Sequence, residues 1–171
     1  MSAPTPAPPA FLTALSAFGW VWVGLLSLDV VSSVVRAALG ALRADGGGVD
    51  AALLTHQVGE ALIVALPTLF LLGVMADFAR FFGRVGVGDV FTERNLRTLR
   101  SGGEGLLAAA VASAVGVPTL LGWIGSAPNR GLGLELNDLT LGVAAMGFAV
   151  AGLGWVFQDA LRIKHENDEI V

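Results

Sequence analysis

Four long apolar runs limit what this chain can fold into more than any other feature. They occupy residues 11–35, 58–82, 105–124 and 139–157. A helix rises about 1.5 Å per residue, so about 20 residues cross a hydrocarbon core of roughly 30 Å. Charged residues make up only 14% of the sequence, about half the share that is usual in a soluble domain. We therefore expect an all-α protein whose four helices span a membrane and pack as a bundle.

Glycine, proline and polar residues separate or interrupt the apolar runs. Three consecutive glycines lie within residues 40–50 and predict a break after the first run. Pro67 and Pro118 lie inside the second and third runs, where we expect kinks. Asn137 or Asp138 precedes the fourth run and can cap it, because either side chain accepts hydrogen bonds from free backbone N–H groups.

The two ends of the chain differ in composition from its middle. Residues 1–10 are rich in Pro and Ala without periodicity, which predicts a disordered tail. They hold no Lys or Arg, so the first apolar run makes a poor secretory signal, and we interpret it as a retained helix. The transmembrane domain then covers residues 11–165, and residues 166–171 form an acidic tail.

Positive charge is gathered on one side of the predicted membrane domain. Seven Lys and Arg residues lie on the side of the two termini, and the other three lie on the opposite side. The seven are Arg80, Arg84, Arg94, Arg97, Arg100, Arg162 and Lys164, and the three are Arg36, Arg43 and Arg130. Because cytoplasmic loops carry the excess of positive residues, we predict a multi-pass protein with both termini in the cytoplasm.

The segment between the second and third runs predicts a short amphipathic helix over residues 93–101. Thr92 is a suitable N-cap, and Gly102 and Gly103 are suitable stop signals. Its basic residues are Arg94, Arg97 and Arg100. We expect this cytoplasmic helix to lie at the interface, where its arginines contact headgroups or bind a partner. Direct nucleic-acid binding is not expected, because the net charge is −4.

A sequence pattern in the same segment resembles a known family. The pattern is GxxFTxxNxxxL, formed by Gly88, Phe91, Thr92, Asn95 and Leu99. Together with the polar Glu166, Asn167 and Asp168 after a Phe-containing fourth helix, it is similar to the domain-of-unknown-function family 2975 (DUF2975). The resemblance covers nearly the whole chain after the proline-rich tail. It implies a small bacterial inner-membrane protein, and such proteins are often encoded beside a helix-turn-helix regulator of the Xre/Cro type.

The C-terminal tail has the character of a docking segment. It passes from two cations to several acids and ends in two β-branched residues, so it can add to the edge of a partner's sheet or face a basic surface. Its alternative state is a solvated, frayed terminus. We predict that Glu166, Asn167 and Asp168 bind a cytoplasmic partner together with the three arginines, plausibly the helix-turn-helix regulator that the resemblance implies.

Three acidic residues lie within the apolar runs, where a charge is costly. Asp29 and Glu60 fall in the outer half and can pair with Arg36 and His56, while Asp77 can pair with Arg80 at the cytoplasmic edge. Structural pairing is one reading of these acids. The alternative is a transporter, channel or lipid and ligand sensor that uses Asp29 and Glu60.

Nothing in the sequence indicates enzymatic chemistry. The chain has no cysteine, and its two histidines are predicted on opposite sides of the membrane, so we expect no catalytic residue, metal or cofactor. Small residues are dense in the third and fourth runs. They predict close helix packing, within one chain or in a homo-oligomer.

Overall fold

The computed structural model describes residues 10–44, 50–85, 92–126 and 131–168, and every regular element among them is helical. The elements are α1 (Ala10–Ala44), α2 (Ala51–Val85), α3 (Glu93–Val111), the π-helical segment η1 (Ala112–Gly116), α4 (Val117–Trp123) and α5 (Asp138–Asp168). Four stretches are long and apolar enough to cross a membrane, namely α1, α2, α3 through α4, and α5. The predicted all-α class is confirmed, as are four stretches of helix suited to span a membrane.

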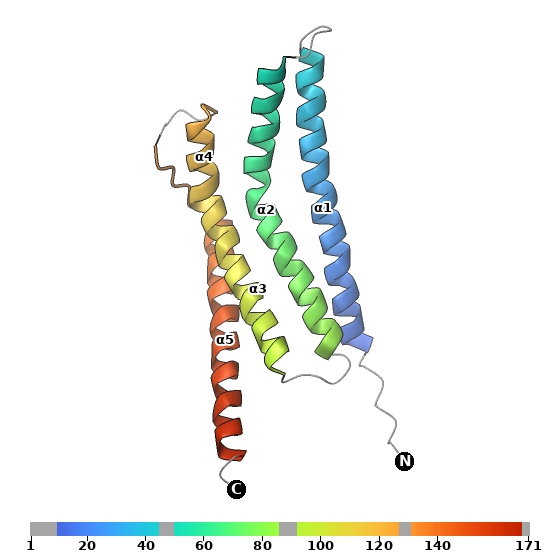
Figure 1. The fold of residues 1–171 in the computed structure, drawn as a ribbon, viewed down its shortest axis with the longest axis vertical. Coiled ribbons are helices and arrows are strands. Elements are labelled where there is room, and N and C mark those ends of the chain that lie inside the picture. The colour runs from blue at the N-terminus through green and yellow to red at the C-terminus, as the bar shows by residue number, and fades with distance from the viewer. Residues whose placement is uncertain (1–9, 45–49, 86–91, 127–130, 169–171) are drawn as a thin grey trace.

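The helices stand side by side in an open row (Figure 1). α1 packs on α2, α2 packs on α3, and α3 packs on α5, whereas α1 and α5 make no extensive contact with each other among the described residues. Successive long helices run in opposite directions, so α1 begins and α5 ends at the same end of the molecule (Figure 1). The arrangement is therefore a row of antiparallel helices with α1 and α5 at its edges.

Small residues allow α1 and α2 to approach closely. A Cβ atom built on Gly19 would lie 2.8 Å from the Cβ of Ala79, closer than real side chains come. The Ser16 hydroxyl, one turn away, donates to the Ala79 carbonyl at 2.8 Å. Association in lipid depends on such dispersion contacts and interhelical hydrogen bonds, because lipid tails are as apolar as the helices themselves.

α3 lies between α2 and α5, and its glycines form both contacts. A Cβ on Gly102 or Gly105 would meet the side chains of Phe78 or Val74 on α2, and one on Gly103 would meet the backbone of α5. Gly102 and Gly103 are buried inside α3, which runs unbroken to Val111. The prediction of a separate amphipathic helix over residues 93–101 is thus wrong, because these glycines serve packing rather than termination.

The third span changes its helical geometry before Pro118. Residues Ala112–Gly116 form a π-helical turn, and α4 starts at Val117 with the proline in its first turn. Proline has no N–H to donate to the carbonyl four residues back, which is that of Ala114. The backbone N–H of Glu135 donates to that carbonyl instead, at 2.8 Å. The predicted disturbance at Pro118 is therefore present as a π-turn, and the connection to α5 satisfies the freed group.

Pro67, the proline of the second apolar run, lies within a continuous helix. Pro67 is inside α2, which extends over Ala51–Val85 without interruption. α2 changes direction along its length (Figure 1). Membrane helices tolerate such a residue when neighbouring groups accommodate the missing hydrogen bond.

Burial follows the pattern of a protein surrounded by lipid. The buried apolar residues are mostly alanines, while large side chains such as Leu139 (78% exposed) and Phe148 (75% exposed) point outward. In water this surface would cost about 25 cal/mol for every Å² of apolar area. A hydrocarbon solvent removes that cost, so the exposed face of each span is suited to a bilayer.

The described residues begin at Ala10 and end at Asp168. The predicted tail, residues 1–10, lies outside the described residues except for Ala10, which starts α1. α5 continues to Asp168, so Glu166, Asn167 and Asp168 are helical rather than strand-like. Residues 169–171 lie outside the described part of the chain.

Candidate functional site

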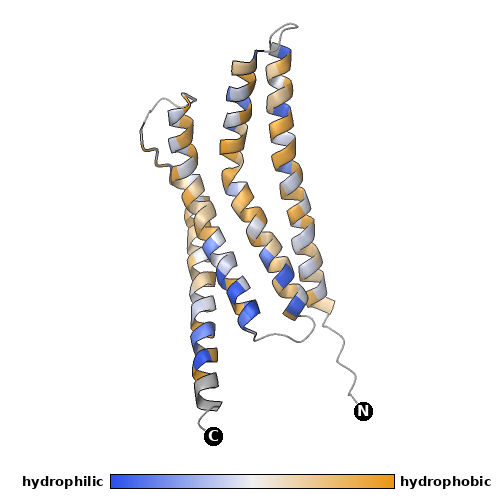
Figure 2. Ribbon diagram, viewed as in Figure 1, coloured by the Kyte–Doolittle hydropathy of each residue, from blue (hydrophilic) through white to orange (hydrophobic). Residues whose placement is uncertain are grey.

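Polar residues gather at one end of the helix row, where α2 and α5 end and α3 begins (Figure 2). Six arginines belong to these stretches of helix: Arg80, Arg84, Arg94, Arg97, Arg100 and Arg162. They are the arginines of the set that the sequence placed on the side of the termini. We call this region the arginine-rich end.

Thr92 and Asn95 determine where α3 begins. The Thr92 side chain accepts a hydrogen bond from the backbone N–H of Asn95 at 3.3 Å, so the predicted N-cap is confirmed. The Asn95 side chain is completely buried. The first turn of α3 is therefore turned toward the interior of the helix row. Gly88 and Phe91, two other residues of the family pattern, lie outside the described residues.

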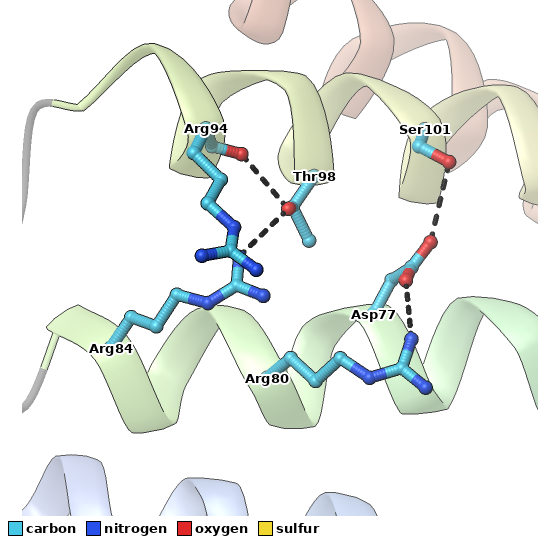
Figure 3. A network of polar contacts seen from close by, with 6 residues as sticks. All are labelled: Asp77, Arg80, Arg84, Arg94, Thr98 and Ser101. Carbon is cyan, nitrogen blue, oxygen red and sulfur yellow. Dashed lines mark hydrogen bonds and ion pairs between the residues drawn. The ribbon is translucent and has the colours of Figure 1, made fainter.

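A polar network joins α2 to α3 (Figure 3). Asp77 pairs with Arg80 at 3.1 Å, as predicted, and its second oxygen accepts from the Ser101 hydroxyl at 3.2 Å. Arg84 donates to the Thr98 hydroxyl at 3.2 Å. Arg80 also lies 5.9 Å from the centre of the Trp20 ring on α1. These contacts connect three helices at the arginine-rich end.

A cavity of about 960 Å³ opens between α3 and α5. Its lining from α3 and the preceding cap is Thr92, Glu93, Arg97, Arg100, Ser101 and Glu104, and its lining from α5 is Gln158, Leu161 and Arg162. We call this cavity the α3–α5 pocket. It holds three guanidinium groups and two carboxylates, so it can receive a ligand that carries charges of both signs.

Arg100 is the most firmly positioned charge of the α3–α5 pocket. Its guanidinium carbon lies 3.8 Å from the centre of the Trp155 ring, and its Nε donates to Glu104 Oε1 at 2.7 Å. Gly154 brings α5 close to the Arg100 backbone, because a Cβ there would lie 3.0 Å from the Arg100 Cα. No other hydrogen bond of Arg100 occurs within the described residues, so both Nη groups can donate to a ligand.

The remaining charges of the α3–α5 pocket are paired along their own helices. Arg97 pairs with Glu93 at 2.6 Å, and Arg162 pairs with Asp159 at 3.1 Å. All four side chains are more than half exposed. Exposed pairs of this kind contribute about 0 to 1 kcal/mol, so a ligand with better geometry can replace them.

The three arginines predicted to act together do not share one face. Arg97 and Arg100 line the α3–α5 pocket, whereas Arg94 lies beside Arg84 and Thr98 on the side of α2 (Figure 3). A spacing of three residues falls short of the 3.6 residues in a turn, so successive arginines drift around the helix. The three arginines of α3 are thus directed toward two different neighbouring helices, α2 and α5.

A second, smaller pocket of about 440 Å³ lies between α1 and α2. Asp29 and Glu60 line it together with the polar side chains of Ser33, Gln57 and Thr68. Among the described residues neither acid forms an ion pair, so the predicted pairing with Arg36 and His56 is wrong. The reason is that other acceptors lie closer. Arg36 donates to Ser32 at 3.4 Å, and the His56 Nε2 lies 3.2 Å from the Ile124 carbonyl.

Sequence reasoning missed the contribution of α5 to the α3–α5 pocket. Trp155, Gln158 and Arg162 follow one another at three and four residues, which places them on one helix face. The same face continues to Ala151, which packs against Gly103. That spacing was readable in the sequence, but the choice of α3 as the facing helix was not.

Four apolar spans in alternating directions, with large side chains directed outward, define the class of multi-pass membrane proteins. Within that class the chain belongs to the family described as Protein of unknown function (DUF2975), whose model matches residues 51–171. The recognised family is confirmed, although the match begins at α2 and so leaves out α1. No curated protein and no solved structure matches the chain.

Proposed function

We propose that this protein is a non-enzymatic component of the bacterial inner membrane that binds and modulates a cytoplasmic partner protein, with both termini in the cytoplasm. The gathering of six arginines at the end where α1 begins and α5 ends carries this proposal. Positive residues concentrate on the cytoplasmic side of membrane proteins, and their asymmetry sets the orientation.

The chemistry of the partner follows from the charges that this end presents. Arg94 is exposed on α3, and the acidic residues Glu166 and Asp168 end α5. A partner with adjacent acidic and basic surfaces would match both regions. The resemblance of the chain to its family suggests a small helix-turn-helix regulator of the Xre/Cro type, which the protein would sequester at the membrane.

Full-length protein with charge-reversed surfaces tests the proposal. Affinity capture from native membranes should recover the regulator with the wild type and lose most of it with Arg94→Glu combined with Asp168→Lys. Arg43→Glu is the matched control. Arg43 lies in the last turn of α1, away from the arginine-rich end, so its substitution should leave capture unchanged. Equal capture by all three proteins, or a reporter after Val171 on the outer side, would refute the proposal.

A second candidate function is supported by the pocket between α1 and α2. Two acids without an ion pair among the described residues line a cavity inside the predicted spans, as in a small transporter, channel or ligand sensor. Asp29→Asn and Glu60→Gln should abolish flux or ligand response in proteoliposomes while thermal unfolding stays unchanged. Wild-type behaviour of both variants would remove this candidate.

A further inference from the structure

The α3–α5 pocket carries an inference that needs no partner protein. We propose that it binds the headgroup of an aminophospholipid such as phosphatidylethanolamine, with the phosphodiester on Arg97 and Arg100 and the ammonium on Glu104. The recognised chemical group is a phosphodiester joined to a primary ammonium. The ligand that carries it is the membrane lipid rather than a soluble phosphate compound.

The position of the pocket favours a lipid. It opens where the apolar part of α5 gives way to polar residues, which is the level of headgroups in a bilayer (Figure 2). Trp155 is 55% exposed, and tryptophan prefers this level because its ring is apolar and its N–H is polar.

One donor for a phosphodiester, the Arg100 guanidinium, is fixed in place before a ligand arrives. Trp155 and Glu104 hold the Arg100 guanidinium from two sides, which leaves its Nη groups as donors. Arg97 uses one Nη for Glu93, so its other nitrogen atoms remain available within the described part of the chain. The Gln158 amide also has no hydrogen-bond partner among the described residues. Preorganised charge-assisted donors of this kind bind phosphate oxygens well.

A carboxylate of the pocket selects the amine. Glu104 lies one helical turn beyond Arg100 on α3 and can accept hydrogen bonds from a primary ammonium. A choline headgroup has no N–H to donate, and a glycerol headgroup has no positive charge. The cavity volume of about 960 Å³ is roughly thirty times the volume of one water molecule, far more than inorganic phosphate needs.

Native mass spectrometry of the full-length protein in nonionic detergent tests the assignment. Phosphatidylethanolamine, phosphatidylglycerol and phosphatidylcholine with identical acyl chains are added separately, and the lipid-bound fraction is measured. The wild type should bind phosphatidylethanolamine about tenfold more tightly than either other lipid. Arg100→Gln should remove about tenfold of that affinity, while Arg84→Gln, which changes an arginine outside the pocket, should bind like the wild type.

A second variant keeps the test decisive if Arg100→Gln folds poorly. Glu104→Gln should bind phosphatidylethanolamine and phosphatidylglycerol equally, a change of selectivity that misfolding would not produce. Equal binding of all three lipids by the wild type would overturn the proposal. So would equal losses with Arg84→Gln and Arg100→Gln, or full displacement of the lipid by inorganic phosphate or glycerophosphoethanolamine at millimolar concentration.

Discussion

Gly103 lies where α3 and α5 are in close contact, and its replacement by alanine tests the packing of the row. A Cβ atom there would lie 2.3 Å from the backbone nitrogen of Ala151 and 2.7 Å from its Cα. These are backbone atoms of a long helix, so no side-chain rotation can relieve the overlap. The Gly103→Ala variant therefore has to move one helix away from the other.

The cost can be estimated from the size of that movement. Carbon atoms in contact prefer about 3.5 to 4.0 Å, so the helices must separate by roughly 1 Å at this point. Overpacking of this kind costs about 1 to 3 kcal/mol. Alanine also improves helix propensity by up to about 1 kcal/mol relative to glycine, which offsets part of the loss. We expect Gly103→Ala to lower the free energy of unfolding by about 1 to 2 kcal/mol.

A matched control separates packing from propensity. Gly152 follows Ala151 on α5, and a Cβ built there meets nothing within 4 Å. Gly152→Ala makes the same chemical change without the overlap, so it should unfold at the same or a higher denaturant concentration than the wild type. Tryptophan fluorescence during titration of the detergent-solubilised protein with sodium dodecyl sulfate measures both variants. Identical midpoints for Gly103→Ala and Gly152→Ala would refute the close contact of α3 and α5.

Three further substitutions test local contacts by the same unfolding measurement. Thr92→Ala removes the side chain that caps α3 and should cost about 1 kcal/mol, while Thr92→Ser should cost little, and equal losses would contradict the capping role. Asn137→Ala should cost a similar amount, because the Asn137 side chain accepts from the Thr140 N–H at 2.8 Å at the start of α5, and Asn137→Asp should retain the cap. Asp77→Asn should cost about 1 kcal/mol or less, because the Asp77–Arg80 pair is partly exposed, and a loss several times larger would show that the network between α2 and α3 is more buried than its geometry indicates.

Features that depend on neighbouring residues could be predicted from the sequence. The four spans follow from uninterrupted apolar runs, and the caps follow from Thr92 and Asn137, whose side chains precede helical segments. The Asp77–Arg80 pair is one helical turn apart, so its geometry is local as well. Each of these requires only the geometry of one helix.

Features that depend on which helices meet could not be predicted in the same way. Glycines often end a helix, so Gly102 and Gly103 predict a stop. Because α3 lies between two neighbouring helices, these glycines instead allow close contact with both. Likewise, Asp29 and Glu60 were expected to pair with cations nearby in the sequence, whereas the structure places both in one pocket between α1 and α2. In both cases tertiary contacts, rather than local preference, decide the outcome.

The family match includes one of the two pockets completely and the other only in part. The family match covers residues 51–171, which include every residue of the α3–α5 pocket. The pocket between α1 and α2 draws Asp29 and Ser33 from outside that range. Within the described part of the chain α1 makes extensive contact with α2 only, so this pocket depends on a helix at the edge of the row. A function common to the family can therefore use the complete α3–α5 pocket. The matched residues form only the α2 wall of the other pocket.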